Sequence, residues 1–279
     1  MLFRSADDTK VAHRIRSPAD AERLQAAIDV LTGWAERWQM AFNVQKCKIM
    51  HVGRSNPRHE YTMLGHVLST TEEEKDLGVL VTSNLKPAKQ CARAAATAST
   101  VLGQITRAFH YRDRHVFARL YRTYVRPHLE YAVQAWAPWA RGDVEKLERV
   151  QERAVRQISG LRGSTYEEKL DELGMLPLAE RRHQLDMCSA YRVLTGKDDV
   201  QPEIWFTPAT ASGRETRQAA HVLNVRPRHG RLEVRANCYS VRTCEPWNRI
   251  PADIREKKTA AAFKAAYAAH RRQIGRAHV

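Results

Sequence analysis

The sequence predicts a protein of the α+β class, in which a strand-rich front is followed by a basic, mainly helical body. Two patterns lead to this expectation. Short apolar runs separated by turn residues occupy the first 83 residues, and apolar residues recur at helical spacing through most of the remainder. Hydrophobic residues make up 43% of the 279 residues, which is enough for a packed core in one large or two modest domains.

The front is expected to begin as a strand, a tight turn and a second strand over residues 1–15. A helix follows, with Ser17 as its N-cap and Pro18 in its first turn. Apolar residues then recur on one face of this helix, including Trp34 and Trp38. We expect these tryptophans to pack in the core rather than to stack on nucleic-acid bases.

After this helix the sequence predicts a strand over residues 42–52, which carries Lys46 and Lys48. A hairpin is expected over residues 61–83, with residues 77–81 as its second strand. Gly78 falls inside that strand. A glycine there marks a bulge or the close approach of another backbone or ligand.

From Pro87 onward the pattern is helical. Helices are expected over residues 89–110, 112–125 and 142–158, in a pair around Pro177 within 166–194, and over 259–270. Pro127 is expected to end the second of these, because proline cannot donate a backbone hydrogen bond. The periodic pattern fades over residues 198–230, which we interpret as a loop or linker.

The charge balance points to an anionic partner. Lys and Arg number 46 and Asp and Glu number 31, so the net charge is +15. Such a charge attracts polyanions, of which nucleic acid is the first candidate and an anionic membrane surface the second; a basic surface without a specific ligand is the third interpretation. The sequence contains no apolar run long enough to span a membrane and no signal-peptide pattern. We therefore expect an intracellular protein, cytoplasmic or nuclear and not secreted.

The five cysteines are few and irregularly spaced, and no C-x-x-C pair occurs. Neither a zinc ribbon nor a disulfide framework is indicated. We expect the cysteines to serve as small buried hydrophobic residues in a reducing compartment.

Asp7 and Asp8 stand next to each other in the first expected turn, within SADDTK. Two interpretations apply to this pair. Aspartate is a common turn residue, so the pair can serve only the bend. Paired carboxylates also hold hard cations such as Mg²⁺ and leave coordination positions open for substrate phosphates. The rest of the sequence has to decide between them.

Longer stretches bear on that choice. In order, they are SADDTK, WAERWQMAFNVQKCKIMHVG, YTMLG, EKDLGVLV, VRPHLEYAVQAWAP, VQERAVRQISGLRG, LGMLPLAERR and WNRIPADI. Together they resemble the reverse transcriptase of LINE-type, jockey-like non-LTR retrotransposons, from its aspartate-pair motif onward. The resemblance implies an α+β fold with a partial palm of β-hairpins plus a helix, followed by a mainly helical thumb and C-terminal region.

The resemblance also implies a division of the chain. The expected parts are a partial palm (1–83), a helical thumb (84–165), a helical extension (166–197), a loop or linker (198–230) and a small C-terminal unit (231–279).

The resemblance assigns roles by position. Asp7 and Asp8 match the catalytic, metal-binding aspartates, with Mg²⁺ or Mn²⁺ as the cofactor. Lys46 matches a catalytic palm lysine near the incoming triphosphate, although a solvated lysine is an equal interpretation. A primer-grip-like hairpin is matched by Leu77, Gly78 and Val79. Contacts to nucleic acid are expected from Lys10, Lys48, Arg107, Arg112, Arg114 and Arg126.

The implied activity of the parent enzyme is RNA-directed DNA synthesis by two-metal nucleotidyl transfer, with an RNA template, a DNA primer and dNTPs as partners and no membrane. Ser5 departs from the family, which has an aromatic residue at this position. The first catalytic aspartate and the fingers of the family precede SADDTK, so we expect a truncated fragment that is inactive alone. The alternatives are a non-catalytic basic module that binds RNA or DNA and a translated fragment without function.

Overall fold

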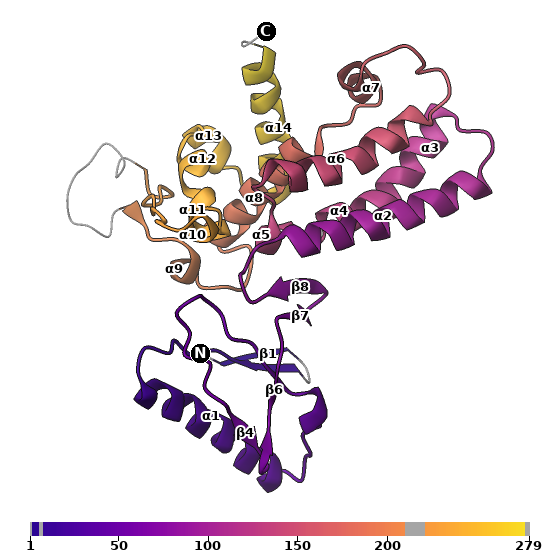
Figure 1. The fold of residues 1–279 in the computed structure, drawn as a ribbon. Helices are drawn as coiled ribbons and strands as arrows, with labels where there is room; N and C mark the ends of the chain where they lie inside the picture. Colours follow the sequence, from indigo (N-terminus) through magenta and orange to yellow (C-terminus); the bar gives the residue numbers. More distant parts are fainter. Residues whose placement is uncertain (1, 6–7, 210–220, 277–279) are drawn as a thin grey trace. The chain divides into compact units, whose positions relative to one another are not determined.

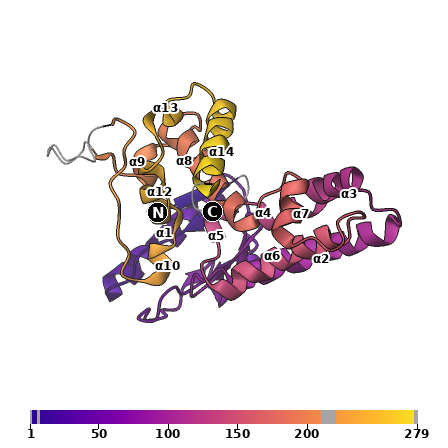
Figure 2. The same ribbon diagram turned by 90° about the horizontal axis from the view of Figure 1, so that it is seen from above.

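The computed structural model describes residues 2–5, 8–209 and 221–276, and the chain divides into two compact units, residues 1–86 (unit 1) and 87–279 (unit 2). As described, unit 1 combines short two-stranded sheets with the long helix α1, and unit 2 is helical (Figures 1 and 2). This composition confirms the predicted α+β class.

Unit 1 begins with the expected hairpin. Strands β1 (Leu2–Ser5) and β2 (Asp8–Val11) pair antiparallel, with Ser5 opposite Asp8. The two residues between these strands lie outside the described part. The two predicted strands are confirmed, and the predicted turn between them lies outside the described residues.

Helix α1 (Pro18–Arg37) begins where the sequence predicts. Asp20 in its first turn accepts hydrogen bonds from the backbone N–H groups of Arg16 and Ser17, at 2.9 and 3.0 Å. These bonds lower the pKa of the Asp20 carboxyl because they stabilise its charged form. Backbone donors that have no partner within the helix are satisfied in this way, which fixes the helix start.

The core of unit 1 lies between α1 and the chain segment that follows it. Its buried members are Ala21, Ile28, Tyr61, Met63 and Leu68. The prediction that the tryptophans pack in the core is wrong, because Trp34 is 37% exposed and Trp38 is 64% exposed. Trp38 follows Arg37, the last residue of α1, so it lies beyond the turns that pack against the core.

The strand predicted over residues 42–52 is mostly absent. A 3₁₀ turn, η1 (Val44–Lys46), is followed by a strand of two residues, β3 (Lys48–Ile49). β3 pairs in parallel with β6 (Ser69–Thr70). Lys46 therefore lies on the turn before the strand and not within a strand.

The region predicted as one hairpin forms two. β4 (Thr62–Met63) pairs with β5 (His66–Val67), and β7 (Glu73–Asp76) pairs with β8 (Val79–Thr82). Each hairpin closes on a Leu-Gly turn. Leu77 and Gly78 have φ of 44° and 86°, so both central residues are left-handed, as in a type I′ turn. Gly78 therefore serves the turn, and the prediction that it lies inside a strand is wrong.

Unit 2 starts at a proline-led helix. Its first helices are α2 (Ala88–Ala108), α3 (Arg114–Leu120), η2 (Tyr121–Val125), α4 (Arg126–Glu130), α5 (Val133–Trp136), α6 (Arg141–Arg156), α7 (Tyr166–Glu172) and α8 (Leu178–Leu194). α2 and α6 run side by side in both views (Figures 1 and 2). Their facing sides are apolar: Leu102 of α2 is 1% exposed and Leu147 of α6 is fully buried.

The break predicted at Pro127 does not occur. The chain continues from α3 through η2, a π-helical segment, into α4. In η2 the N–H of Arg126 bonds to the carbonyl of Tyr121, five residues back. This wider turn places Pro127 in the first turn of α4, where a missing N–H costs little. The helix thus passes its proline by changing its hydrogen-bond pattern.

The C-terminal region completes the fold of unit 2. Its helices are α9 (Pro202–Trp205), α10 (Glu233–Ala236), α11 (Tyr239–Arg242), α12 (Cys244–Asn248), α13 (Ala252–Arg255) and α14 (Ala260–Arg276). Helices α11 to α14 share one core with α8, in which Trp247 and Phe263 are fully buried. Phe206 and Val225, from the segment interpreted as a loop or linker, also lie in this core.

Candidate active site and nucleic-acid interface

Of the aspartate pair, the structure describes only Asp8. Asp7 is outside the described residues, and Asp8 is the first residue of β2. Across the described part of the chain, no three His, Cys, Asp or Glu residues gather closely enough to hold a metal ion. Because that finding leaves Asp7 out, metal binding by the aspartate pair stays a prediction.

Within unit 1, an ion pair connects β2 with the hairpin predicted to be primer-grip-like. The ammonium of Lys10 donates to the carboxylate of Asp76, and both side chains are exposed. Asp76 directly precedes the Leu77-Gly78 turn. The structure therefore brings the strand that starts at Asp8 and the Leu-Gly hairpin together, as a shared site requires.

The Leu77-Gly78 turn is exposed at its tip and anchored at its base. Leu77 is 60% exposed, whereas Val79 is buried at 8% exposure and pairs with Asp76 across the hairpin. A non-glycine residue with positive φ is uncommon and costs conformational energy. The tip combines this strain with an exposed apolar side chain, which is the kind of feature that functional turns carry.

Lys46 and Lys48 are exposed on η1 and β3. Neither forms an ion pair with any residue that the structure describes within 4.0 Å. Their charges are therefore available to an anion.

The four arginines predicted to contact nucleic acid differ in their surroundings. Arg112 donates to the backbone carbonyls of Phe109 and Thr106 at 3.3 and 3.2 Å, so it caps the end of α2. Arg114 forms an ion pair with Glu172 at 2.9 Å. These contacts give both side chains a structural role inside unit 2.

Arg126 is partly buried, and its side chain is 19% exposed. It lies 3.7 Å from Glu130, which also accepts a two-pronged contact from Arg181. Burial, and then the neighbouring Arg181 guanidinium, lower the pKa of Arg126. Arg107, by contrast, is exposed on the last turn of α2.

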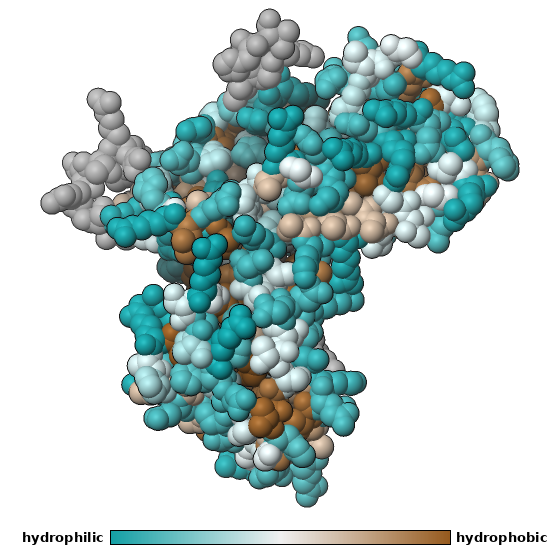
Figure 3. Space-filling model, viewed as in Figure 1, coloured by the Kyte–Doolittle hydropathy of each residue, from teal (hydrophilic) through white to brown (hydrophobic). Residues whose placement is uncertain are grey.

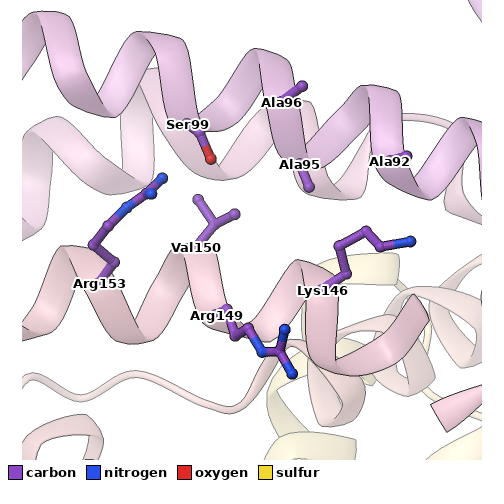
Figure 4. Close-up of a pocket in the computed structure, with 8 residues that line it drawn as sticks. All are labelled: Ala92, Ala95, Ala96, Ser99, Lys146, Arg149, Val150 and Arg153. Carbon is purple, nitrogen blue, oxygen red and sulfur yellow. The ribbon is translucent and has the colours of Figure 1, made fainter. Parts of the chain in front are cut away.

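A groove between α2 and α6 adds basic residues that belong to none of the site residues predicted from the sequence. Its volume is about 240 Å³. α2 contributes Ala92, Ala95, Ala96 and Ser99, and α6 contributes Lys146, Arg149, Val150 and Arg153 (Figure 4). The signal in the sequence is a set of small residues at i, i+4 and i+7 on α2. It becomes meaningful only once α6 is known to lie opposite.

Two exposed aromatic rings follow α2 in the sequence. Phe109 and Tyr111, in the loop after α2, are 41% and 80% exposed. Such rings can stack on nucleic-acid bases.

In the part of the chain that the structure covers, no helix is both long and apolar enough to cross a membrane.

Comparison with known proteins supports the resemblance seen in the motifs. The chain is 27% identical over 160 residues to the RNA-directed DNA polymerase from mobile element jockey of Drosophila funebris, and 23% identical over 160 residues to that of Drosophila melanogaster. Each match covers 56% of this chain and 18% of the relative, so the matched region spans less than a fifth of these proteins. No family model matches the chain, and no solved structure matches it significantly.

Proposed function

We infer that this chain, a relative of the RNA-directed DNA polymerases of jockey-like non-LTR retrotransposons, supplies the aspartate-pair end of a polymerase palm and the thumb that follows it. The observation that carries this proposal is the similarity to two jockey polymerases. The hairpin with Asp8 at its turn, followed by a helical unit, supports it. The division into palm (1–83), thumb (84–165) and C-terminal parts (166–197, 198–230 and 231–279) belongs to the proposal.

In this proposal Asp7 and Asp8 are the residues that would hold Mg²⁺ or Mn²⁺ in the parent polymerase, whereas the chain alone is expected to bind these ions poorly. When bound, the ions activate the primer 3′ hydroxyl and stabilise the departing pyrophosphate. Lys46 offers its exposed ammonium to the triphosphate of the incoming dNTP. Leu77, Gly78 and Val79 hold the primer end, which the exposed Leu77-Gly78 turn beside Lys10 would contact.

The chain alone is proposed to bind an RNA template paired with a DNA primer without extending the primer. The resemblance implies a further catalytic aspartate, and none of the matched motifs supplies it. Loss of one electrostatic component of a catalytic site costs about 10²–10³ in rate. The net charge of +15 favours the alternative function, a nucleic-acid-binding module without chemistry.

Two measurements on the purified chain test this proposal. We expect it to bind an RNA–DNA hybrid with an affinity that falls steeply with salt, because phosphate contacts release counterions. In a primer-extension assay with Mg²⁺ or Mn²⁺, we expect no dNTP incorporation above that of an Asp7→Asn, Asp8→Asn variant. Aspartate-dependent incorporation would overturn the proposed inactivity. Absence of binding at low salt would overturn the proposed function.

An intracellular setting is part of the proposal. All five cysteines are free thiols in the structure. Burial raises the pKa of Cys91 to about 12, so this thiol is poorly reactive. Thiols of this kind serve packing in a reducing compartment.

A further inference from the structure

We propose that the groove between α2 and α6 binds the sugar–phosphate backbone of one nucleic-acid strand, with Lys146, Arg149 and Arg153 as its phosphate contacts. This inference rests on the proposed function, because it names the surface of unit 2 that holds the nucleic acid. It assigns contacts to residues other than the arginines that the family resemblance selects.

The charge of the groove is the first argument. The residues that line it include three cations and no acid. Lys146 lies 3.0 Å from Asp143 and Arg149 lies 3.4 Å from Glu145, and both acids are outside the lining. The Arg149 side chain is 72% exposed, and exposed ion pairs contribute little to stability, so a phosphate can replace Glu145 at small cost.

Arg153 is the most available of the three. It is exposed, and it forms no ion pair within 4.0 Å with any residue that the structure describes. Figure 4 shows its guanidinium extending from α6 toward Ser99 of α2. A phosphate between the two helices would meet this guanidinium on one side and the Ser99 hydroxyl on the other.

The shape of the groove is the second argument. Its α2 side consists of alanines and one serine, so a bulky backbone can approach the helix closely. Figure 3 shows a weakly hydrophobic strip along α2 bordered by hydrophilic surface. Lys146 and Arg153 are seven residues apart on α6, which is about 10.5 Å along the axis. A row of this length can contact more than one phosphate of a strand, whose phosphates advance by roughly 3.4 Å each along the axis of a duplex.

An acidic protein segment is the competing occupant of a basic groove. The three cations form one row along α6. A nucleic-acid strand carries one charge on every phosphate and so suits a row of cations, whereas the spacing of carboxylates along a peptide varies with its sequence. The net charge and the polymerase relatives favour nucleic acid as well.

The charge test uses an Arg149→Gln, Arg153→Gln variant of the full chain and a fluorescent RNA–DNA hybrid as the probe. This variant keeps Lys146 beside the buried Asp143. We expect at least about tenfold weaker binding at 100 mM salt, and a salt slope that is smaller by about 1.8 because two phosphate contacts are lost. The matched control is Lys258→Gln, Lys264→Gln, which removes the same charge from exposed sites of unit 2 outside the groove.

The shape test uses Ala96→Leu, Ser99→Leu, which fills the groove without changing its charge. Leucine is a good helix former, and Ala96 is exposed, so we expect α2 to keep its stability in thermal unfolding. We expect this variant to weaken hybrid binding about tenfold. A groove that serves only helix packing would leave the affinity unchanged, which would overturn the inference.

The outcomes separate the two proposals. If the wild-type chain does not bind the hybrid at 50 mM salt, the proposed function fails and the groove inference fails with it. If the wild-type chain binds but the groove variant and the control lose affinity equally, only the groove inference fails. A third outcome is that polyglutamate, at an equal concentration of negative charge, displaces the hybrid from the wild-type chain and that Arg149→Gln, Arg153→Gln weakens polyglutamate binding as much as hybrid binding. This outcome would assign the groove to an acidic protein segment and overturn the inference.

Discussion

Arg242 shows how single residues hold the C-terminal region to the rest of unit 2. Its guanidinium, on α11, donates to both carboxylate oxygens of Asp186 on α8, at 2.9 and 3.0 Å. It also donates to the backbone carbonyls of Asn237 and Gln134, at 2.9 and 3.1 Å. Three segments far apart in sequence therefore depend on one side chain.

Replacing Arg242 should test this role. Arg242→Met keeps much of the side-chain volume and leaves the Asp186 carboxylate, which is 8% exposed, without its cation. Breaking a buried pair costs about 3–5 kcal/mol, and we expect a loss of that order in the free energy of unfolding measured with urea at pH 7. Arg249→Met is the matched control, because Arg249 and Glu245 are exposed and such pairs contribute at most about 1 kcal/mol.

The loss in the free energy of unfolding of the Arg242→Met variant should depend on pH. Burial raises the pKa of Asp186 even beside Arg242. Without the arginine the pKa rises further, so the folded variant binds a proton that the unfolded chain releases near pH 4. The variant therefore loses stability as pH rises through this window, and its deficit should be smaller at pH 5 than at pH 7. An equal deficit at both values would contradict the assigned role of Asp186.

At the scale of elements, the two Leu-Gly turns of unit 1 offer a direct test of strain. Leu64 and Leu77 have φ of 51° and 44° at exposed hairpin tips. Leu77→Asn places there a residue that tolerates the left-handed conformation. We expect unit 1 to gain about 1 kcal/mol in urea unfolding, because an L-residue pays about 1–2 kcal/mol in this region.

The second turn provides the control for that substitution. Leu64→Asn should stabilise unit 1 similarly. If the Leu77 tip contacts the primer end, Leu77→Asn alone should weaken hybrid binding, so that stability and affinity change in opposite directions. Equal affinity for both variants and the wild-type chain would remove Leu77 from the proposed site.

Elements with strong local signals could be predicted from the sequence. Ser17, Pro18 and Asp20 mark the start of α1, and the structure begins the helix there. The passage through Pro127 could not be predicted, because it depends on a π-helical turn that tertiary packing supports. The turn at Leu77 could not be predicted, because Leu77 begins a short apolar run that indicates a strand, whereas its turn conformation follows from the pairing of β7 with β8.

Some features of the candidate site could likewise be predicted from the sequence, and others could not. The motif around Asp8 predicts a hairpin, and the described backbone confirms it. The charge of Arg126 predicts a phosphate contact, but its partial burial beside Glu130 depends on helix packing that the sequence does not reveal. Conversely, Arg149 and Arg153 are candidate phosphate contacts only because Ser99 and its neighbours on α2 form the other side of the groove. A binding groove between two helices requires knowledge of their pairing.

At the scale of the whole molecule, the two units differ in how much they bury. The core cluster of unit 1 is small, and it is built around Ile28, Tyr61 and Met63. Unit 2 contains a larger cluster with Trp247 and Phe263, as well as the apolar interface of α2 and α6. Because buried apolar surface is the main favourable term in folding, unit 1 should be the less stable unit.

We therefore expect the chain to unfold in two steps. In hydrogen-exchange mass spectrometry with increasing urea, peptides from residues 8–86 should lose protection at lower urea than peptides from α2, α6 and α8. The first step should also have the smaller dependence on urea, because this dependence scales with the surface exposed. Leu77→Asn should shift only the first step and Arg242→Met only the second. A single step shared by all peptides, shifted by both substitutions, would mean that the units fold as one, and would contradict independent roles for a palm-like and a thumb-like part.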